Sequence, residues 1–257
     1  MLLSIYNKEL YSRYKSNSQR ARVMPEAWYT NNMYCPCCLN KSLIKFPDNN
    51  KAADFYCVNC KNKFETKASS NKFSKRVVDG EYNTMIAALS SDNAPNFFLM
   101  QYSRDDWAIK NLHVVPNFFI SSFMIEKRNE LSSNARRKGW IGCNILINNI
   151  PDEGKIFVVK NEKEIDMNTV NKLYKKTIFL KSKDPKVRGW TLDVWRCIRD
   201  LDKQDFALAD LYTFKDRLKE LHPDNHHVDD KIRQQLQLLR DNGILKFNNR
   251  GNYSLIR

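Results

Sequence analysis

Alternating polar and apolar residues predict strands in the first part of the chain. Residues 53–57 and 63–67 alternate in this way on either side of a polar turn at 58–62, a pattern typical of a β-hairpin. Apolar segments of strand length follow at 97–103 and 155–159, and such segments are typical of the central strands of a sheet. We therefore expect this part of the chain to be built on a β-sheet.

The predicted hairpin has a polar face that carries two carboxylates and an amine. Side chains alternate across a strand, so Glu65 and Lys67 share one face. If Cys57 lies opposite Phe64, then Asp54 faces Lys67 and Glu65 is a diagonal neighbour. In that assumed register the side chains of Asp54, Glu65 and Lys67 converge.

The C-terminal part has the periodicity of helices. Apolar residues recur at helical spacing in 189–201, 208–221 and 229–241. A strand, a turn at 248–252 and a final strand follow, as in the wing of a winged helix. The charged, proline-containing segment 181–190 is the expected linker to this module.

The chain is strongly basic, and the charge is unequal between the two expected domains. The net charge is +14 and the sequence pI is about 9.4, which favours an anionic partner such as nucleic acid. Residues 1–182 hold 28 Lys and Arg against 17 Asp and Glu, whereas residues 183–257 hold 15 against 12. Most of the positive field therefore belongs to the first domain.

No segment has the run of about 18 apolar residues that a membrane span requires. The first 22 residues turn polar and basic at once and contain no apolar core of signal-peptide length. We expect a soluble, cytoplasmic protein with no membrane contact.

The cysteine spacing predicts a structural zinc site. Cys35-x2-Cys38, 18 intervening residues and Cys57-x2-Cys60 match the spacing of a tetrahedral four-thiolate site. The first pair could instead begin at Cys37, but only Cys35 and Cys38 have the two-residue spacing. Cys37 is then a spare, exposed thiol.

Asp54, ten intervening residues and Glu65-x-Lys67 form the pattern of divalent-metal phosphodiesterases. Carboxylate oxygens bind Mg²⁺, which usually takes one or two protein carboxylates together with water and substrate phosphate. The metal polarises the phosphate, and a nearby lysine can orient the attacking water. A charged, exposed hairpin shows the same spacing by chance, so the pattern alone does not decide.

The third helix of the winged module is the expected major-groove element. Its polar residues are candidates to contact bases and phosphates, since Gln can address adenine and Arg can address guanine. Arg250 in the wing would reach the backbone or the minor groove. The alternative is that these side chains form the solvated face of an ordinary helix. The helix candidates are Lys231, Arg233, Gln234, Gln235 and Gln237.

A second basic segment, residues 132–145, is a candidate DNA contact in the first domain. Arg136 and Arg137 would mainly contact phosphates, which position a protein without specifying sequence. Trp140 could stack on bases or wedge between them, although a tryptophan followed by isoleucine is more often a core residue.

Eight segments carry a family resemblance: YKSNSQRAR (14–22), ADFYC (53–57), FE-x-K (64–67), DG-x-Y-x-TM (79–85), NAPNFFLM (93–100), ARRKGWIGCNI (135–145), RGWT (188–191) and IRQQLQLLRD (232–241). With these segments the chain resembles the DpnI-type methyl-directed restriction endonucleases over essentially its whole length. The resemblance implies an α/β (α+β) nuclease core of the PD-(D/E)XK type with a zinc ribbon, followed by a winged helix. It also implies Mg²⁺-dependent cleavage of double-stranded DNA at Gm6ATC sites, which carry N6-methyladenine.

The resemblance assigns the catalytic roles to Asp54, Glu65 and Lys67 and the zinc to the four cysteines of the two pairs. One departure is that Ala53 stands where the motif has its proline; the proline shapes the backbone and binds no metal. The sequence leaves the oligomeric state open, because either a dimer or a monomer cutting each strand in turn can cleave a palindrome.

Two hypotheses therefore remain. The first is a type II, methyladenine-dependent endonuclease. The second is a non-catalytic reader or regulator, in which a zinc ribbon and a winged helix bind DNA without cutting it. Only the first needs Asp54, Glu65 and Lys67.

Overall fold

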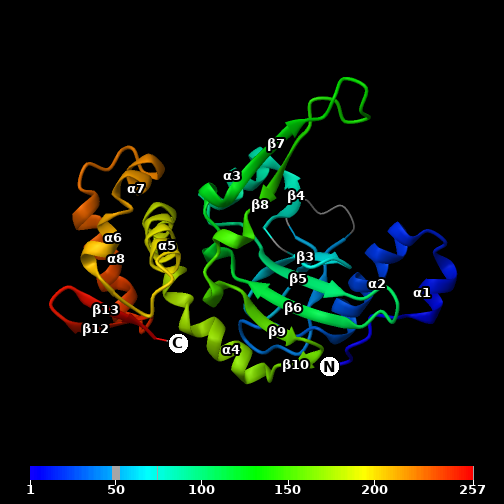
Figure 1. Ribbon diagram of the computed structural model, residues 1–257. Helices are drawn as coiled ribbons and strands as arrows, with labels where there is room; N and C mark the ends of the chain where they lie inside the picture. The colour runs from blue at the N-terminus through cyan, green and yellow to red at the C-terminus, as the bar shows by residue number, and fades with distance from the viewer. Residues whose placement is uncertain (48–52, 74, 257) are drawn as a thin grey trace.

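The computed structural model describes residues 1–47, 53–73 and 75–256. It has a mixed α/β architecture with a central sheet, followed by a C-terminal helical domain (Figure 1). The predicted fold class is therefore confirmed.

The helices of the described residues are α1 (Lys8–Arg13), α2 (Asn17–Asn32), α3 (Tyr82–Ser90), α4 (Met167–Lys176), α5 (Pro185–Asp200), α6 (Leu208–Tyr212), α7 (Lys215–Leu221) and α8 (Val228–Asp241). Short 3-10 helices are η1 (Asn117–Phe119), η2 (Ser122–Met124), η3 (Ile147–Asn149), η4 (Asp152–Gly154) and η5 (Ile178–Leu180).

The strands are β1 (Ile44–Lys45), β2 (Phe55–Tyr56), β3 (Lys63–Ser69), β4 (Val77–Glu81), β5 (Asn96–Tyr102), β6 (Ile109–Val115), β7 (Ile125–Glu130), β8 (Ile141–Ile145), β9 (Ile156–Lys160), β10 (Lys163–Glu164), β11 (Asp205–Ala207), β12 (Leu245–Asn249) and β13 (Asn252–Leu255).

Three sheets organise these strands. The largest has the order β1-β2-β3-β5-β6-β9-β10, and the β3–β5 pair is parallel. A second sheet, β4-β8-β7, projects from the first domain as a long hairpin between β7 and β8. The third sheet, β11-β13-β12, belongs to the C-terminal domain.

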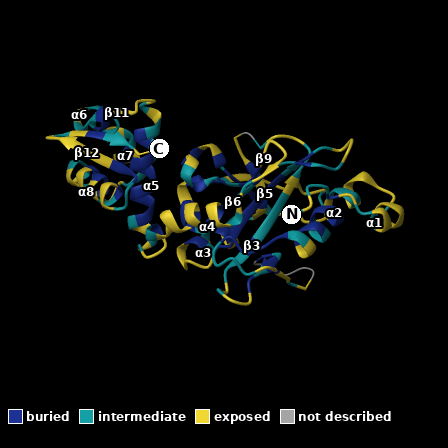
Figure 2. Ribbon diagram, turned by 90° about the horizontal axis from the view of Figure 1, so that it is seen from below, coloured by how far each residue is buried: buried dark blue, intermediate teal, exposed yellow. Residues whose placement is uncertain are grey.

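An aromatic cluster holds α2 against the large sheet. The rings of Phe64 and Phe98 stack with their centroids 4.9 Å apart, and the Tyr29 ring stacks on Phe98 at 5.4 Å. All three side chains are buried. Figure 2 shows β5 and β6 of this sheet largely in the colour of buried residues. Because Phe64 points into this core, the side chains of Glu65 and Lys67 both point to the opposite face of β3.

The register of the β2–β3 hairpin corrects the sequence-based expectation. Phe55, not Cys57, lies opposite Phe64. The Cys57 N–H donates to the carbonyl of Asn62 at 3.0 Å, so the turn closes at Cys57 and the pairing slips by two residues. A slip of two keeps every side chain on its expected face. It places Asp54 beside Glu65 rather than opposite Lys67.

This turn is one half of a four-cysteine cluster. The Cys35 and Cys60 sulfurs are 3.5 Å apart and the Cys38 and Cys57 sulfurs 3.6 Å apart, and all four lie within 4.8 Å of one another. Tetrahedral zinc with bonds of about 2.3 Å requires sulfurs about 3.8 Å apart. The donor set and spacing therefore fit zinc. The Asn62 side chain also donates to the Cys60 sulfur, at 3.1 Å.

Cys37 lies outside this group of four, as the spacing indicates. It is not exposed, however; its side chain is half-buried and packs against the core.

The C-terminal domain has the predicted third helix and wing, with changes at other boundaries. Ile232, Leu236 and Leu239 of α8 are completely buried, as their spacing predicts. The helix expected over residues 208–221 is broken at Thr213 and Phe214 into α6 and α7. The first helix starts at Pro185, so most of the expected linker is helical.

Helix α5 packs against the first domain at the junction. The Trp195 indole is buried beside Phe119, with ring centroids 5.8 Å apart. Arg188 forms an ion pair of 2.8 Å with Asp92, and Arg199 donates to the carbonyl of Ile150 at 2.9 Å. These contacts combine an apolar centre with charged flanks.

None of the described helices is long and apolar enough to cross a membrane.

Replacing Cys60 by serine is expected to abolish zinc binding and to destabilise the fold. A structural thiolate site can contribute on the order of 10 kcal/mol, so the thermal midpoint should fall steeply. Zinc content by elemental analysis and thermal unfolding measure both effects. Cys37→Ser, in the other cysteine turn of the cluster, is the matched control and should keep one zinc per chain; loss of zinc in that variant would contradict the ligand set.

Candidate active site and DNA interface

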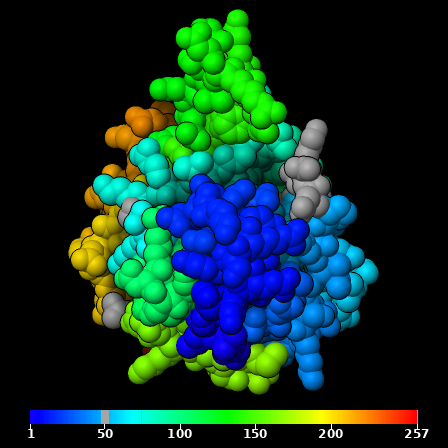
Figure 3. All heavy atoms as spheres, turned by 90° about the vertical axis from the view of Figure 1, so that its right-hand side faces the viewer, coloured from blue at the N-terminus to red at the C-terminus, as the bar shows by residue number. Residues whose placement is uncertain are grey.

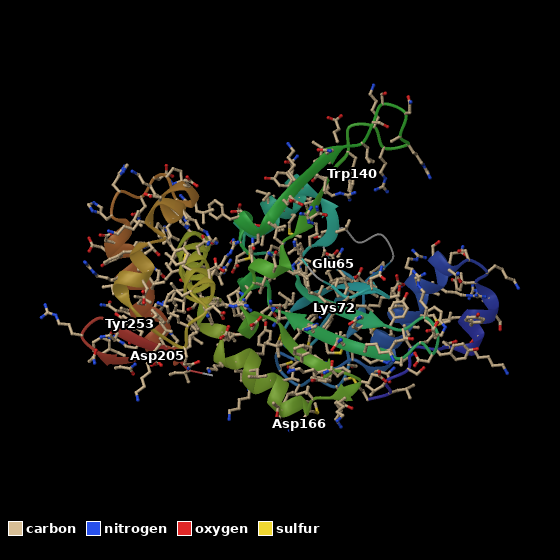
Figure 4. The ribbon with its side chains drawn as sticks, viewed as in Figure 1. Glu65, Lys72, Trp140, Asp166, Asp205 and Tyr253 are labelled. Carbon is tan, nitrogen blue, oxygen red and sulfur yellow. The ribbon has the colours of Figure 1, made fainter. Side chains whose placement is uncertain are left out.

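Asp54, Glu65 and Lys67 line one cavity of about 660 Å³ in the first domain. Its walls come from α2, from β3 and from the segment that leads into β4. Figure 4 labels Glu65 and Lys72 in this region, below the hairpin that carries Trp140. The structure thus brings the three sequence-predicted residues together.

Asp54 is fixed by the returning strand. Its Oδ2 accepts hydrogen bonds from the Thr66 N–H at 2.7 Å and from the Thr66 hydroxyl at 2.8 Å. Both bonds use the same oxygen, so the carboxylate is oriented with its second oxygen directed away from Thr66. This pinning depends on the register of the hairpin, because Thr66 adjoins Glu65 on β3.

Lys67 lies between two carboxylates. Its Nζ is 2.6 Å from Oε1 of Glu65 and 2.6 Å from Oδ1 of Asp79. Asp79 is on β4, and its side chain is only 2% exposed. The sequence reasoning missed Asp79. The signal that could have revealed it is the strand VVDGE, in which Asp79 shares the inward face with Val77.

Burial and the crowded charges shift the pKa values of this cluster. Burial, reinforced by the negative charge of Asp79, raises the pKa of Glu65 to about 7, although Lys67 opposes the shift. Burial alone would lower the pKa of Lys67, but the two carboxylates raise it above its ordinary value. The pKa of Asp79 is lowered despite burial, because Lys67 stabilises the ionised form. The lysine is therefore held as an ammonium ion.

Cations surround the acidic floor of the cavity. Arg22 of α2, Lys72 and Arg76 line the same cavity and are exposed. Arg76 also forms an ion pair of 3.0 Å with Glu126 on β7. A floor of carboxylates under a rim of cations suits a divalent metal ion and a phosphate that bridges it.

The two carboxylates suit an open Mg²⁺ site that water and substrate complete, rather than a site enclosed by protein ligands. Within residues 1–47, 53–73 and 75–256, the four-cysteine cluster is the one group that brings three or more Cys, His, Asp or Glu ligands within 4.8 Å. Asp54 and Glu65 could supply two oxygens, and Mg²⁺ commonly completes its shell with water and substrate phosphate.

The β7–β8 hairpin presents Arg136, Arg137 and Trp140. It projects from the body of the molecule, as the space-filling view in Figure 3 shows. The two arginines are exposed in the turn at its tip. Trp140 is half-buried against its own strand rather than in the core: a Cβ atom at Gly142 would lie 2.7 Å from two carbons of the indole.

The predicted contact residues of α8 and the wing fall into two groups. Arg233, Gln234 and Gln237 are exposed, as is Arg250 at the wing tip, and Lys231 is half-exposed.

Gln235 is a correction: it is 1% exposed, and its Oε1 accepts a 2.8 Å hydrogen bond from the Thr191 hydroxyl of α5. It lies on the inward face of α8 next to Leu236, and so it joins two helices instead of facing DNA.

Two family models match this chain. That of the Dam-replacing family, DpnI, covers residues 2–183, and that of the Dam-replacing HTH domain covers residues 186–255. They confirm the resemblance that the sequence motifs carry and the DNA-binding winged helix. The chain belongs to the Dam-replacing family, that of the DpnI-type restriction endonucleases.

Proposed function

We propose that this protein is a type II restriction endonuclease that cleaves double-stranded DNA at Gm6ATC sites in a Mg²⁺-dependent reaction. Residues 1–182 would form the catalytic domain and residues 183–257 a DNA-binding domain. The observation that carries the proposal is the convergence of Asp54, Glu65 and Lys67 in one cavity with a cationic rim.

In this proposal Asp54 and Glu65 hold Mg²⁺. The ion would polarise the scissile phosphate and activate water for attack. Lys67, an ammonium flanked by carboxylates, donates a hydrogen bond to a phosphate oxygen or to the attacking water. Attack of the water oxygen at phosphorus would form a new P–O bond as the bond to the departing sugar oxygen breaks; the proton of the attacking water is released to solvent, and the departing oxygen takes a proton from solvent.

The remaining charged surfaces support DNA as the substrate. Arg22 and Lys72 would contact phosphates on either side of the scissile bond, and Arg136 and Arg137 phosphates farther along the duplex. Trp140 would reach the bases, where the N6-methyl group offers an apolar surface in the major groove. The exposed side chains of α8 and Arg250 would give the second domain its own contacts.

A purely DNA-binding protein explains the cavity less well. Burying Glu65, Lys67 and Asp79 together has an unfavourable desolvation free energy, and a protein that only binds DNA does not need such a cluster. Clusters of this kind, in which neighbours shift pKa values in opposite directions, are concentrated at catalytic sites.

Plasmid DNA methylated at GATC is expected to be cut into discrete fragments with Mg²⁺, whereas unmethylated plasmid stays intact. Asp54→Asn should reduce the cleavage rate at least about 10²-fold, because it weakens the carboxylate hold on the ion. Gel electrophoresis with an EDTA control measures this. Intact DNA in every lane, with binding confirmed by gel shift, would favour the reader instead.

Neighbouring glutamines on α8 should respond differently to alanine. Gln234→Ala is expected to weaken DNA binding by about 1–3 kcal/mol with an unchanged melting temperature, since its side chain is exposed. Gln235→Ala should instead cost about 1–3 kcal/mol of folding stability, because it removes the buried hydrogen bond that joins α8 to Thr191 of α5. Fluorescence anisotropy and chemical denaturation separate the two; equal effects on binding would contradict this assignment.

Trp140→Ala is expected to lower kcat/KM on methylated DNA by about 5-fold to 100-fold, the range for losing one aromatic contact with a base. Trp140→Phe should retain most of the activity. Because Trp140 is half-exposed, both variants should have the same melting temperature as the wild-type protein. A Trp140→Ala enzyme with unchanged kcat/KM would exclude the contact.

A further inference from the structure

Asp79 is the buried charge that the proposed mechanism does not use. Its side chain is 2% exposed, and its Oδ1 is 2.6 Å from Nζ of Lys67. The buried carboxylate of Asp79 therefore has the Lys67 ammonium as its counter-charge. Other close groups are Glu65, a like charge, and the Gly80 N–H, which donates to the carboxylate.

The backbone of β4 fixes where this carboxylate lies. Asp79 pairs with Cys143 of β8, and the pairing slips between Asp79 and Glu81, where the strand bulges. Glu81 then caps α3 by accepting from the N–H groups of Asn83 and Thr84. Bulges commonly re-aim a side chain near an active site, and here the strand is held at both ends of the bulge.

Glu65 cannot serve both the ion and the lysine in the same way. In the structure Oε1 of Glu65 is 2.6 Å from Lys67 Nζ. A carboxylate that coordinates Mg²⁺ gives up electron density to the ion, and its hold on the ammonium weakens. Asp79 contacts Lys67 but is not among the residues that line the cavity, so its carboxylate is not in the set that would bind the ion.

We propose that Asp79 is a positioning residue of the endonuclease: its carboxylate holds the Lys67 ammonium in place at the scissile phosphate while Glu65 binds the divalent ion. This inference rests on the proposed function. It adds a fourth residue, from the smaller sheet, to a site whose other three residues come from the β2–β3 hairpin.

The test is Asp79→Asn, which keeps the shape of the side chain and removes its charge. We expect kcat on methylated DNA to fall at least 10-fold, with KM and the affinity for DNA in Ca²⁺ unchanged. We also expect the Lys67 amine to be acylated by acetic anhydride several-fold faster relative to Lys72, because the ammonium loses the Asp79 carboxylate that holds it. Lys72 is the reference because it lines the same cavity and is exposed. Peptide mass spectrometry measures this ratio without any need for cleavage.

Asp193→Asn is the control for removing a buried carboxylate elsewhere. Asp193 is 4% exposed and is 2.9 Å from His222 in the C-terminal domain. The Asp193→Asn protein should be less stable than wild type, with no change in the Lys67 to Lys72 labelling ratio. A loss of activity in Asp79→Asn that only tracks its folded fraction, or a labelling ratio equal to that of wild type, would overturn the inference.

The same experiment separates the two proposals. If the wild-type protein fails to cut DNA, the endonuclease proposal fails, and Asp79 can have no catalytic role. If wild type cuts and Asp79→Asn cuts equally fast, only the role of Asp79 is wrong.

Discussion

Four sulfur atoms on two short turns must meet at one point, and the rest of the site depends on that requirement. Strand β2 has only two residues, too few to set its own register against β3. The Cys57 to Asn62 hydrogen bond and the cluster of Cys35, Cys38, Cys57 and Cys60 close the turn instead. Once the turn is fixed, Thr66 is placed to bind Asp54, and Asp54 lies beside Glu65. The four-cysteine cluster at this turn thus aligns the two carboxylates of Asp54 and Glu65, which repel each other.

The stability of the domain comes from the opposite face of the same strand. Phe64 stacks on Phe98, and Tyr29 ties α2 to them. One residue farther along, Glu65 and Lys67 form part of a partly buried ion cluster, an arrangement that contributes little net stability and is costly when one partner is removed. The alternation of β3 therefore separates the two tasks: one face folds the domain and the other carries the charges.

Residue spacing along the chain was enough to predict the features that depend only on neighbouring residues. Cysteine spacing identified the cluster, alternation placed Glu65 and Lys67 on one face, and helical periodicity found the buried stripe of α8. The register of β2 was beyond reach because it depends on how the turn closes. Asp79 was missed because β4 belongs to a different sheet from β3, so its approach to Lys67 depends on how the two sheets pack. Gln235 was missed because a polar residue on an inward face becomes recognisable only when Thr191 is seen opposite it.

The Lys67–Asp79 ion pair joins two sheets that supply different residues to the site. The large sheet and its hairpin supply Asp54, Glu65 and Lys67, whereas β4-β8-β7 supplies Asp79 and, just before β8 begins, Trp140. Asp79 pairs with Cys143, three residues beyond Trp140, so a displacement of the hairpin would act on the strand that holds the counter-charge of the lysine. In the proposed endonuclease, cleavage must depend on the base that the enzyme contacts. If Lys67 acts at the phosphate and the hairpin contacts DNA, as proposed, the Lys67–Asp79 ion pair and the β4–β8 strand pairing would connect the two.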